Sequence, residues 1–178
     1  MIIGLTGKRN VGKSAAAGFL VEAGFIRAHP FAGGKVASAA YFEYLGATSD
    51  EAQRMVNGDL KDLPSDYLPA RASPRHWMEQ FGKFMGVKMG PDWTLGAELA
   101  RLKRQSPDTN AVVESVVYEE PQLRAAGGII VRITRPGHQG AAGENTDAAQ
   151  ADIAADIEIV NDGSLDDLKR KILTIAGV

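Results

Sequence analysis

The stretch GLTGKRNVGKS, residues 4–14, decides the fold class that this sequence predicts. From Gly7 to Ser14 it matches the pattern G-x-x-x-x-G-K-[ST] in full. The apolar run Met1–Thr6 predicts a short buried strand, and the pattern from Lys13 to about Ala23 predicts a helix. A strand, a glycine-rich turn and a helix in this order are typical of a loop that binds phosphate groups.

The chemistry of such a loop depends on its backbone and on two side chains. Glycine permits the dihedral angles that turn backbone N–H groups toward a phosphate, and the helix N-terminus adds partial positive charge. Lys13 can reach the β- and γ-phosphates of a nucleotide, and the Ser14 hydroxyl can ligate Mg²⁺. The alternative is a glycine-rich turn with an exposed lysine and no ligand. We expect a nucleoside triphosphate site formed by Gly7, Lys8, Arg9, Asn10, Val11, Gly12, Lys13 and Ser14.

The composition excludes several classes of protein. The 178 residues are 44% hydrophobic and 24% charged, which is typical of one globular domain with a sizeable core. A formal net charge of −2 argues against long nucleic acids as partners, and the absence of cysteine excludes disulfides and zinc–thiolate sites. No apolar run approaches the about 20 residues of a membrane span, and no signal peptide precedes the first strand. We expect a soluble protein without a membrane partner.

Segments typical of strands and helices alternate along the rest of the chain. Strands are expected over residues 25–31, 111–117, 128–134 and 157–160. Helices are expected over residues 35–45, 75–85, 94–104 and 119–126, with a last helix after a Ser164 cap. The alternation predicts a three-layer α/β fold in which helices cover both faces of a parallel sheet.

Two segments depart from this alternation. Residues 57–74 contain three prolines, which predicts a loop-rich insertion with short helices at most. Residues 137–151 are small and polar without apolar periodicity, which is typical of a mobile loop or a short lid. No repeat and no linker indicates a second independent domain.

A phosphate loop alone does not choose between a kinase, a GTPase and an ATP-driven machine. The N-K-x-D stretch by which GTPases read guanine is absent. Glu114, after the run Ala111–Val113, could orient Mg²⁺ through water, or it could be a solvated residue at the rim of the sheet. The three histidines are too scattered for a metal site, and no G-x-S-x-G motif supports hydrolase chemistry.

Four groups of motifs run over nearly the whole chain. They are GLTGKRNVGKS at 4–14, FAGGKV at 31–36, SPRHWMEQFG at 73–82, and RAAGGIIVRITRPG at 124–137 with IVNDGSLDDLKRKI at 159–172. Together they resemble the deoxynucleoside monophosphate kinases of tailed bacteriophages, which are relatives of adenylate kinase and dephospho-CoA kinase. R-P-G after a strand, followed by a polar loop and N-D-G-S-L, is more specific than the phosphate loop itself.

The resemblance implies a P-loop NTPase fold over residues 1–178, with a helical acceptor-binding insertion over about 36–105 and a lid over 137–151. It implies that ATP, with Mg²⁺, gives its γ-phosphoryl group to a deoxynucleoside monophosphate, which yields a diphosphate and ADP. The partners are then small nucleotides, and the location is the cytoplasm, that of the host if the protein is viral. The preferred base and the formation of a homodimer remain open.

Cations matter most for phosphoryl transfer, because charge moves with the migrating group. Basic residues occur where the two substrates should meet: Lys35, Arg71, Arg75, Lys83, Lys88, Arg132 and Arg135. The resemblance implies catalytic roles for Lys13, Arg75 and Arg135, and an acceptor site with Lys35, Arg71, Arg75 and Trp93. It also implies that the adenine of ATP is bound by Asn161 and Gly163.

Two positions depart from the pattern of these kinases. Relatives often carry D-x-R after the central strand, whereas this chain has Glu114-Ser115-Val116-Val117, and Gly82-Lys83 replaces a G-T pair. Two alternatives to a deoxynucleoside monophosphate kinase therefore stand: an enzyme similar to dephospho-CoA kinase, and a nucleotide-binding module without turnover.

Overall fold

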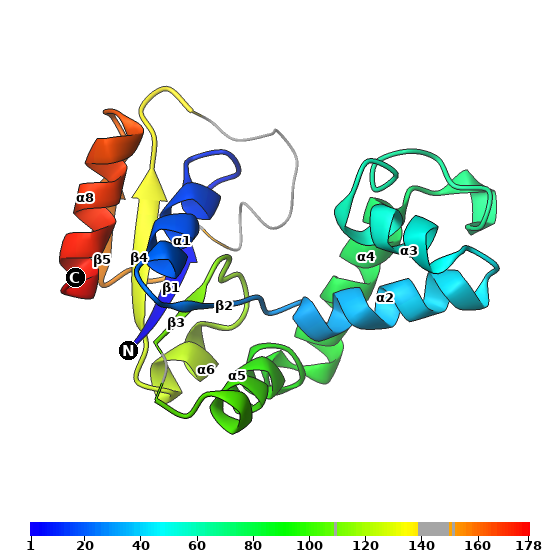
Figure 1. The fold of residues 1–178 in the computed structure, drawn as a ribbon, viewed down its shortest axis with the longest axis horizontal. Helices are drawn as coiled ribbons and strands as arrows, with labels where there is room; N and C mark the ends of the chain where they lie inside the picture. Colours follow the sequence, from blue (N-terminus) through cyan, green and yellow to red (C-terminus); the bar gives the residue numbers. More distant parts are fainter. Residues whose placement is uncertain (109, 139–149, 151) are drawn as a thin grey trace. The chain divides into compact units, whose positions relative to one another are not determined.

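The chain folds into two compact units in a computed structural model that describes residues 1–108, 110–138, 150 and 152–178 (Figure 1). The first unit, here called the sheet unit, comprises Met1–Pro30 and Leu95–Val178. The second, here called the helical unit, comprises Phe31–Thr94. The sequence predicts a helical insertion over about 36–105, and the compact helical unit begins and ends earlier in the chain.

A parallel sheet forms the centre of the sheet unit. In the described part of the chain it has five strands in the order β2-β3-β1-β4-β5. All four neighbouring pairs are parallel. The strands are β1 Ile2–Thr6, β2 Ile26–Ala28, β3 Ala111–Val113, β4 Ile129–Thr134 and β5 Ile157–Val160. This confirms the predicted α/β class with a parallel central sheet.

Helices cover both faces of the sheet, because successive residues of each buried strand point to opposite sides. Val112 and Val131 pack in one core with helices α1 (Lys13–Glu22) and α8 (Leu165–Ala176). Their neighbours Val113 and Ile130 pack in a second core, with Leu95 and Leu102 of helix α5 (Leu95–Gln105) and Leu123 of helix α6 (Glu120–Ala125). The predicted three-layer arrangement is therefore confirmed.

Two predicted strands are shorter in the structure. The strand expected over 25–31 spans only Ile26–Ala28, and the one expected over 111–117 ends at Val113. Beyond Val113 the backbone leaves β3 and bonds elsewhere, since the Val116 N–H donates to the Leu5 carbonyl of β1 at 3.0 Å. The β-branched residues Val116 and Val117 made the predicted strand too long. The chain leaves the sheet after Val113, although the local sequence favours a strand.

The helical unit has its own hydrophobic core, which includes Ala39, Phe42, Met55 and Met78. Its elements are α2 Ala32–Tyr44, α3 Ser49–Asn57, the 3₁₀ turns η1 Pro69–Arg71 and η3 Pro91–Trp93, α4 Pro74–Lys83 and the π-helix η2 Phe84–Met89. The expectation of only short helices over 57–74 is confirmed.

Two details of the helical unit differ from expectation. Helix α2 begins at Ala32 rather than Lys35, and a Cβ at Gly34 would lie 2.0 Å from the Phe31 ring. Glycine is needed there for packing, not to open the helix. Helix α3 was missed, although Thr48 and Glu51 form a capping box at its start.

Two further expectations concern the lid and the absence of a membrane span. Apart from Gly137, His138 and Gln150, the lid expected over 137–151 lies outside the described residues. Within the described ranges, no helix combines the length and the hydrophobicity that a membrane crossing requires.

Candidate phosphate-binding site

The loop from Gly7 to Ser14 connects β1 to α1, as the sequence predicts. Gly7 and Gly12 have φ of 131° and 111°, in the region that favours glycine. A Cβ at Gly7 would lie 2.2 Å from the Ile133 carbonyl oxygen, and one at Gly12 would lie 2.7 Å from Asn161 Nδ2. Both glycines are therefore required by backbone conformation and by close packing.

The N-terminus of α1 is open to an anion. Gly12 is its N-cap residue, and in the described residues no side chain caps the first turn. The first N–H groups of a helix have no partner within the helix, and together with the helix dipole they favour a bound anion. The loop therefore presents backbone donors where the sequence predicts phosphate groups.

The Lys13 side chain folds back over the beginning of the same loop. Its ammonium group donates to the carbonyl oxygens of Gly7 at 2.5 Å and Lys8 at 2.7 Å. Both acceptors are neutral, so these two contacts hold the ammonium group in place without cancelling its charge. A phosphate oxygen near Gly7 and Lys8 would be within reach of this group.

Ser14 and Glu114 lie in contact, although 100 residues separate them in sequence. The Ser14 hydroxyl donates to Glu114 Oε1 at 2.5 Å, and Arg27 donates to the other carboxylate oxygen at 2.9 Å. Glu114 directly follows β3, the neighbour of β1 in the sheet. Both carboxylate oxygens of Glu114 therefore have partners, and its role toward Mg²⁺ stays a prediction.

A hydroxyl and a carboxylate are oxygen ligands of the kind that Mg²⁺ prefers. In the described ranges, no group of three or more acidic or histidine side chains is suited to a metal ion. Mg²⁺ usually keeps several waters and takes further ligands from substrate phosphates. Binding of Mg²⁺ by Ser14 stays a prediction.

Asn161 ties the segment after β5 to the phosphate loop. Its amide donates to the Val11 carbonyl at 2.9 Å, and its backbone N–H donates to the Thr134 carbonyl at 2.8 Å. Gly163 is explained by the cap of α8, since a Cβ there would lie 2.6 Å from Asp167 Oδ2. These contacts position the loop, and the predicted contact of both residues with adenine stays a prediction.

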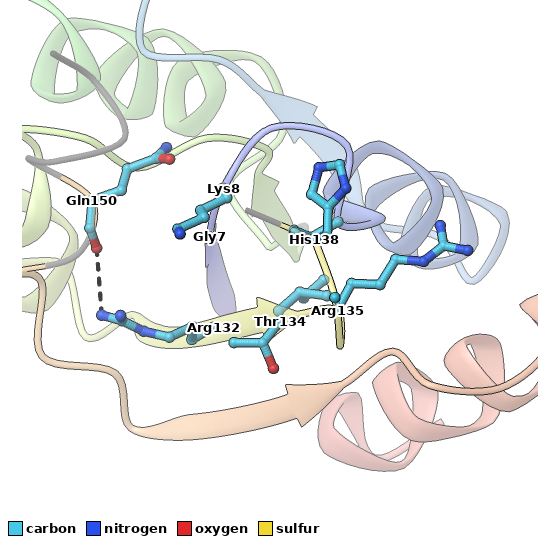
Figure 2. A pocket seen from close by; sticks show the side chains of 10 residues that line it. Gly7, Lys8, Arg132, Thr134, Arg135, His138 and Gln150 are labelled. Carbon is cyan, nitrogen blue, oxygen red and sulfur yellow. Dashed lines mark hydrogen bonds between the residues drawn. The ribbon is translucent and has the colours of Figure 1, made fainter. Parts of the chain in front are cut away.

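A cavity of about 320 Å³ adjoins the beginning of the phosphate loop (Figure 2). Its wall combines three cationic side chains with no Asp or Glu among the described lining residues. The loop contributes Gly7, Lys8 and Val11; the end of β4 and its continuation contribute Arg132, Ile133, Thr134, Arg135, Gly137 and His138; and Gln150 completes the wall. Such a cavity suits an anionic ligand.

Arg135 and His138 belong to the R-P-G segment that follows β4. Arg135 is among the lining residues, and Figure 2 shows its guanidinium pointing away from Gly7 and Lys8. Its predicted contact with the phosphates stays a prediction. The ring nitrogen Nε2 of His138 lies 2.7 Å from the Arg9 carbonyl oxygen. This contact joins the segment to the phosphate loop, and no sequence motif indicated it.

The predicted acceptor-site arginines are paired with carboxylates inside the helical unit. The Arg75 guanidinium bonds both oxygens of Asp62, with its NH2 group 3.0 Å from Oδ2. Arg71 lies 2.7 Å from Asp66 and is 70% exposed. Trp93 is 61% exposed.

Lys61 is a cation that sequence reasoning missed. Burial and the nearby charges of Arg75 and Lys35 lower the pKa of its ammonium group. The Lys61 carbonyl also accepts the Arg75 backbone N–H at 2.9 Å. Lys35, Lys61 and Arg75 therefore gather in the helical unit, and Lys61 lies in a proline-rich stretch that carries no motif.

Glu119 holds the backbone that follows Val116. Its carboxylate accepts the backbone N–H groups of Val117 at 2.9 Å and Tyr118 at 2.8 Å. Burial raises the pKa of Glu119, while the backbone N–H donors act against that shift. This buried carboxylate is another residue for which the sequence carried no signal.

Comparisons with known proteins were made for sequence and for structure. No family model and no curated protein matches the sequence. One similar solved structure is TT1252 from Thermus thermophilus, with TM-score 0.47, 16% identity and coverage of 99% of this chain and 96% of that chain. Another is dephospho-CoA kinase from Campylobacter jejuni, with TM-score 0.48, 16% identity and coverage of 99% and 95%. The activity is therefore inferred from the residues of this chain.

Proposed function

We propose that this chain is an ATP-dependent phosphotransferase that phosphorylates a deoxynucleoside monophosphate. The observation that carries the proposal is the cationic cavity, free of acidic groups among its described residues, at the mouth of a formed phosphate loop. Phosphoryl transfer requires cations around the migrating group, because its charge is spread over three oxygens in the transition state. The cavity and the loop together supply such cations.

Different residues of the sheet unit contact different parts of the phosphoryl donor, ATP. The N–H groups of the loop from Gly7 to Ser14 bind the phosphates of ATP, and Lys13 neutralises charge on the terminal one. Ser14 and Glu114 would hold Mg²⁺, which when bound would polarise the phosphoryl oxygens. Arg135 would stabilise the transferring group.

The reaction is a substitution at the γ-phosphorus. A phosphate oxygen of the acceptor forms a bond to this phosphorus, and the bond to the β–γ bridging oxygen breaks. The electron pair of that bond leaves with ADP, so the products are a diphosphate and ADP. No covalent intermediate on the protein is needed, in keeping with the absence of cysteine from the chain.

We assign the acceptor to the helical unit, as in the bacteriophage kinases that the sequence resembles. Lys35, Lys61 and Arg75 would bind its phosphate, and the exposed ring of Trp93 would stack on its base. Arg71 is a further candidate. Arg75 must exchange Asp62 for the phosphate, so we propose that acceptor binding rearranges this pair. ATP and its acceptor are cytoplasmic metabolites, so we propose a cytoplasmic location.

Two alternatives remain from the sequence: dephospho-CoA as the acceptor, and nucleotide binding without turnover. The second is favoured by one observation, since Arg71 and Arg75 are both engaged with carboxylates. A coupled assay of ADP release separates the three. We would test the common deoxynucleoside monophosphates and dephospho-CoA at saturating ATP and Mg²⁺.

Release of ADP that depends on a monophosphate supports the proposal, and release that depends only on dephospho-CoA supports the first alternative. ATP binding without acceptor-stimulated release would show a binding module. Lys13→Ala is the matched control, because it removes one ammonium group from the loop while a contaminating kinase would be unaffected.

A further inference from the structure

His138 lies directly after the R-P-G segment and reaches the phosphate loop with its ring. Its Nε2 atom lies 2.7 Å from the Arg9 carbonyl oxygen, and Figure 2 shows the ring beside the loop. A carbonyl oxygen can only accept a hydrogen bond, so Nε2 carries the proton and donates it. The backbone of His138 is fixed as well, because its N–H donates to the Arg135 carbonyl at 3.1 Å. The ring therefore holds one peptide group of the phosphate loop from a segment outside that loop.

The Arg9 carbonyl belongs to the peptide group that also carries the Asn10 N–H. This peptide is trans, so its C=O and N–H groups point in opposite directions. Because the carbonyl is directed at His138, the Asn10 N–H is directed away from it. Among the described residues, this N–H has no protein acceptor. It is therefore one of the backbone donors that the loop can offer to a phosphate.

The backbone of Asn10 shows why this peptide group needs to be held. Its φ is 62°, in the left-handed region that residues other than glycine seldom adopt, although Asn tolerates it better than most. Turning the Arg9–Asn10 peptide over would bring this φ to a negative value, which L-residues prefer. The same rotation would direct the carbonyl oxygen where the N–H now points, and there it would repel a phosphate. The local preference of Asn10 therefore opposes the orientation that binds an anion.

The next held peptide of the loop, between Val11 and Gly12, does not have this conflict. The Asn161 amide donates to the Val11 carbonyl at 2.9 Å, so the Gly12 N–H is directed away from Asn161. Gly12 has φ of 111°, which glycine adopts without a steric cost. One peptide thus combines a hydrogen bond with a suitable residue, whereas the Arg9–Asn10 peptide depends on the bond from His138.

We propose that His138 is a positioning residue for the phosphate loop. By holding the Arg9 carbonyl, it keeps the Asn10 N–H directed at a phosphate of the bound nucleotide, and it does so before the nucleotide arrives. His138 acts through the backbone and makes no contact with the nucleotide in this role. The inference rests on the proposed function only in requiring that the loop binds a nucleotide, and it does not depend on any acceptor.

Titration calorimetry with ADP and Mg²⁺ tests this inference on the native chain, His138→Phe and His138→Gln. Phenylalanine keeps a ring but has no donor, whereas the glutamine amide nitrogen can replace Nε2 as a donor. The loss of one hydrogen bond implies that His138→Phe weakens ADP about three- to tenfold, and His138→Gln should recover most of this loss. His76→Phe is the matched control, because His76 is exposed on α4 in the helical unit, and its ADP affinity should equal that of the native chain.

The amide proton of Asn10 gives a second readout, which a merely structural role of His138 would not change. A hydrogen bond to a phosphate oxygen moves the NMR resonance of an amide proton downfield. At saturating ADP we expect this shift in the native chain and in His138→Gln. In His138→Phe it should be much smaller, because the Asn10 N–H no longer faces the phosphate.

Each other outcome has a defined meaning. Unchanged ADP affinity in His138→Phe would overturn the inference, and so would a loss that His138→Gln does not recover or an Asn10 shift that His138→Phe retains. If His138→Phe does not fold, His138→Asn replaces it, since its side chain is too short to reach the Arg9 carbonyl. Native affinity and a native Asn10 shift in that variant would overturn the inference. If the native chain does not bind ADP, the proposed function itself fails, which is a separate result.

Discussion

The phosphate loop and the helical unit hold their cations in different ways. In the phosphate loop, the Lys13 ammonium group donates to the backbone carbonyls of Gly7 and Lys8. In the helical unit, Arg75 and Arg71 are paired with the carboxylates of Asp62 and Asp66. The first arrangement is ready for an anion, whereas the second must release a carboxylate before it accepts one. We therefore propose that the donor site is preorganised and that the acceptor site is not.

Lys13→Ala gives the largest expected effect, because it removes a cation that is already in place. We expect kcat to fall on the order of 10²-fold or more, as for other preorganised electrostatic groups. Steady-state kinetics with the best acceptor measure it. Near-normal turnover of Lys13→Ala would show that the phosphate loop is not part of the catalytic centre. The difference between the two units would then not explain activity.

Arg75→Ala tests the acceptor side of the comparison. Loss of a charge-assisted contact should raise KM for the monophosphate about ten- to hundredfold and leave KM for ATP nearly unchanged. Arg54→Ala is the matched control, since Arg54 bonds both oxygens of Asp59 in the same unit. A selective rise in KM for ATP would show that the substrates were assigned to the wrong units.

Asp62→Asn also tests the acceptor side of the comparison, and it should lower KM for the monophosphate rather than raise it. If Asp62 competes with the acceptor for Arg75, its neutralisation should lower KM for the monophosphate about two- to fivefold. An exposed ion pair is worth about 0.2–1 kcal/mol, which sets that range. Asp59→Asn should change nothing. An increase in KM for Asp62→Asn would mean that this carboxylate assists binding.

The charge of Lys61 gives the smallest expected effect. Its pKa is lowered, chiefly by burial and next by Arg75 and Lys35, so the folded state disfavours the protonated form. This destabilisation is complete below the lowered pKa and is relieved as pH rises toward 10.5, the ordinary value. Lys61→Met should therefore unfold at slightly higher urea than the native chain at pH 7.

The difference between Lys61→Met and the native chain should shrink as the pH rises toward the ordinary lysine pKa. Urea titrations at several pH values measure it. The same variant should also lose part of the stabilisation that a monophosphate gives. A native chain that is more stable than Lys61→Met at pH 7 would contradict the view that these cations repel one another.

Local signals were sufficient for the phosphate loop and for much of the fold. Its strand, glycines and helix lie within one short stretch, so pattern and geometry agree there. The capping box of Thr48 and Glu51 is equally local, and α3 could have been found from it. The Ser164 cap is a signal of the same kind. It predicts the last helix, and the structure confirms that α8 begins directly after Ser164.

Contacts between distant segments could not be predicted in this way. Asn161 bonds the Val11 carbonyl across 150 residues, and Ser14 meets Glu114 across 100. The pairing of Arg75 with Asp62 depends on how a proline-rich loop folds back, which no periodicity encodes. Sequence reasoning therefore located several of the charged residues, while the structure shows that Arg75 pairs with Asp62 and that Ser14 contacts Glu114.

The transfer of labelled phosphate tests the central claim most directly. The native chain would be incubated with Mg²⁺, ATP labelled in its γ-phosphate and a mixture of deoxynucleoside monophosphates, and the products separated. A phosphotransferase with a preorganised donor site should place the label in a deoxynucleoside diphosphate, and Lys13→Ala should abolish this product. Label found only in inorganic phosphate, or remaining in ATP while the nucleotide is bound, would contradict the proposed activity.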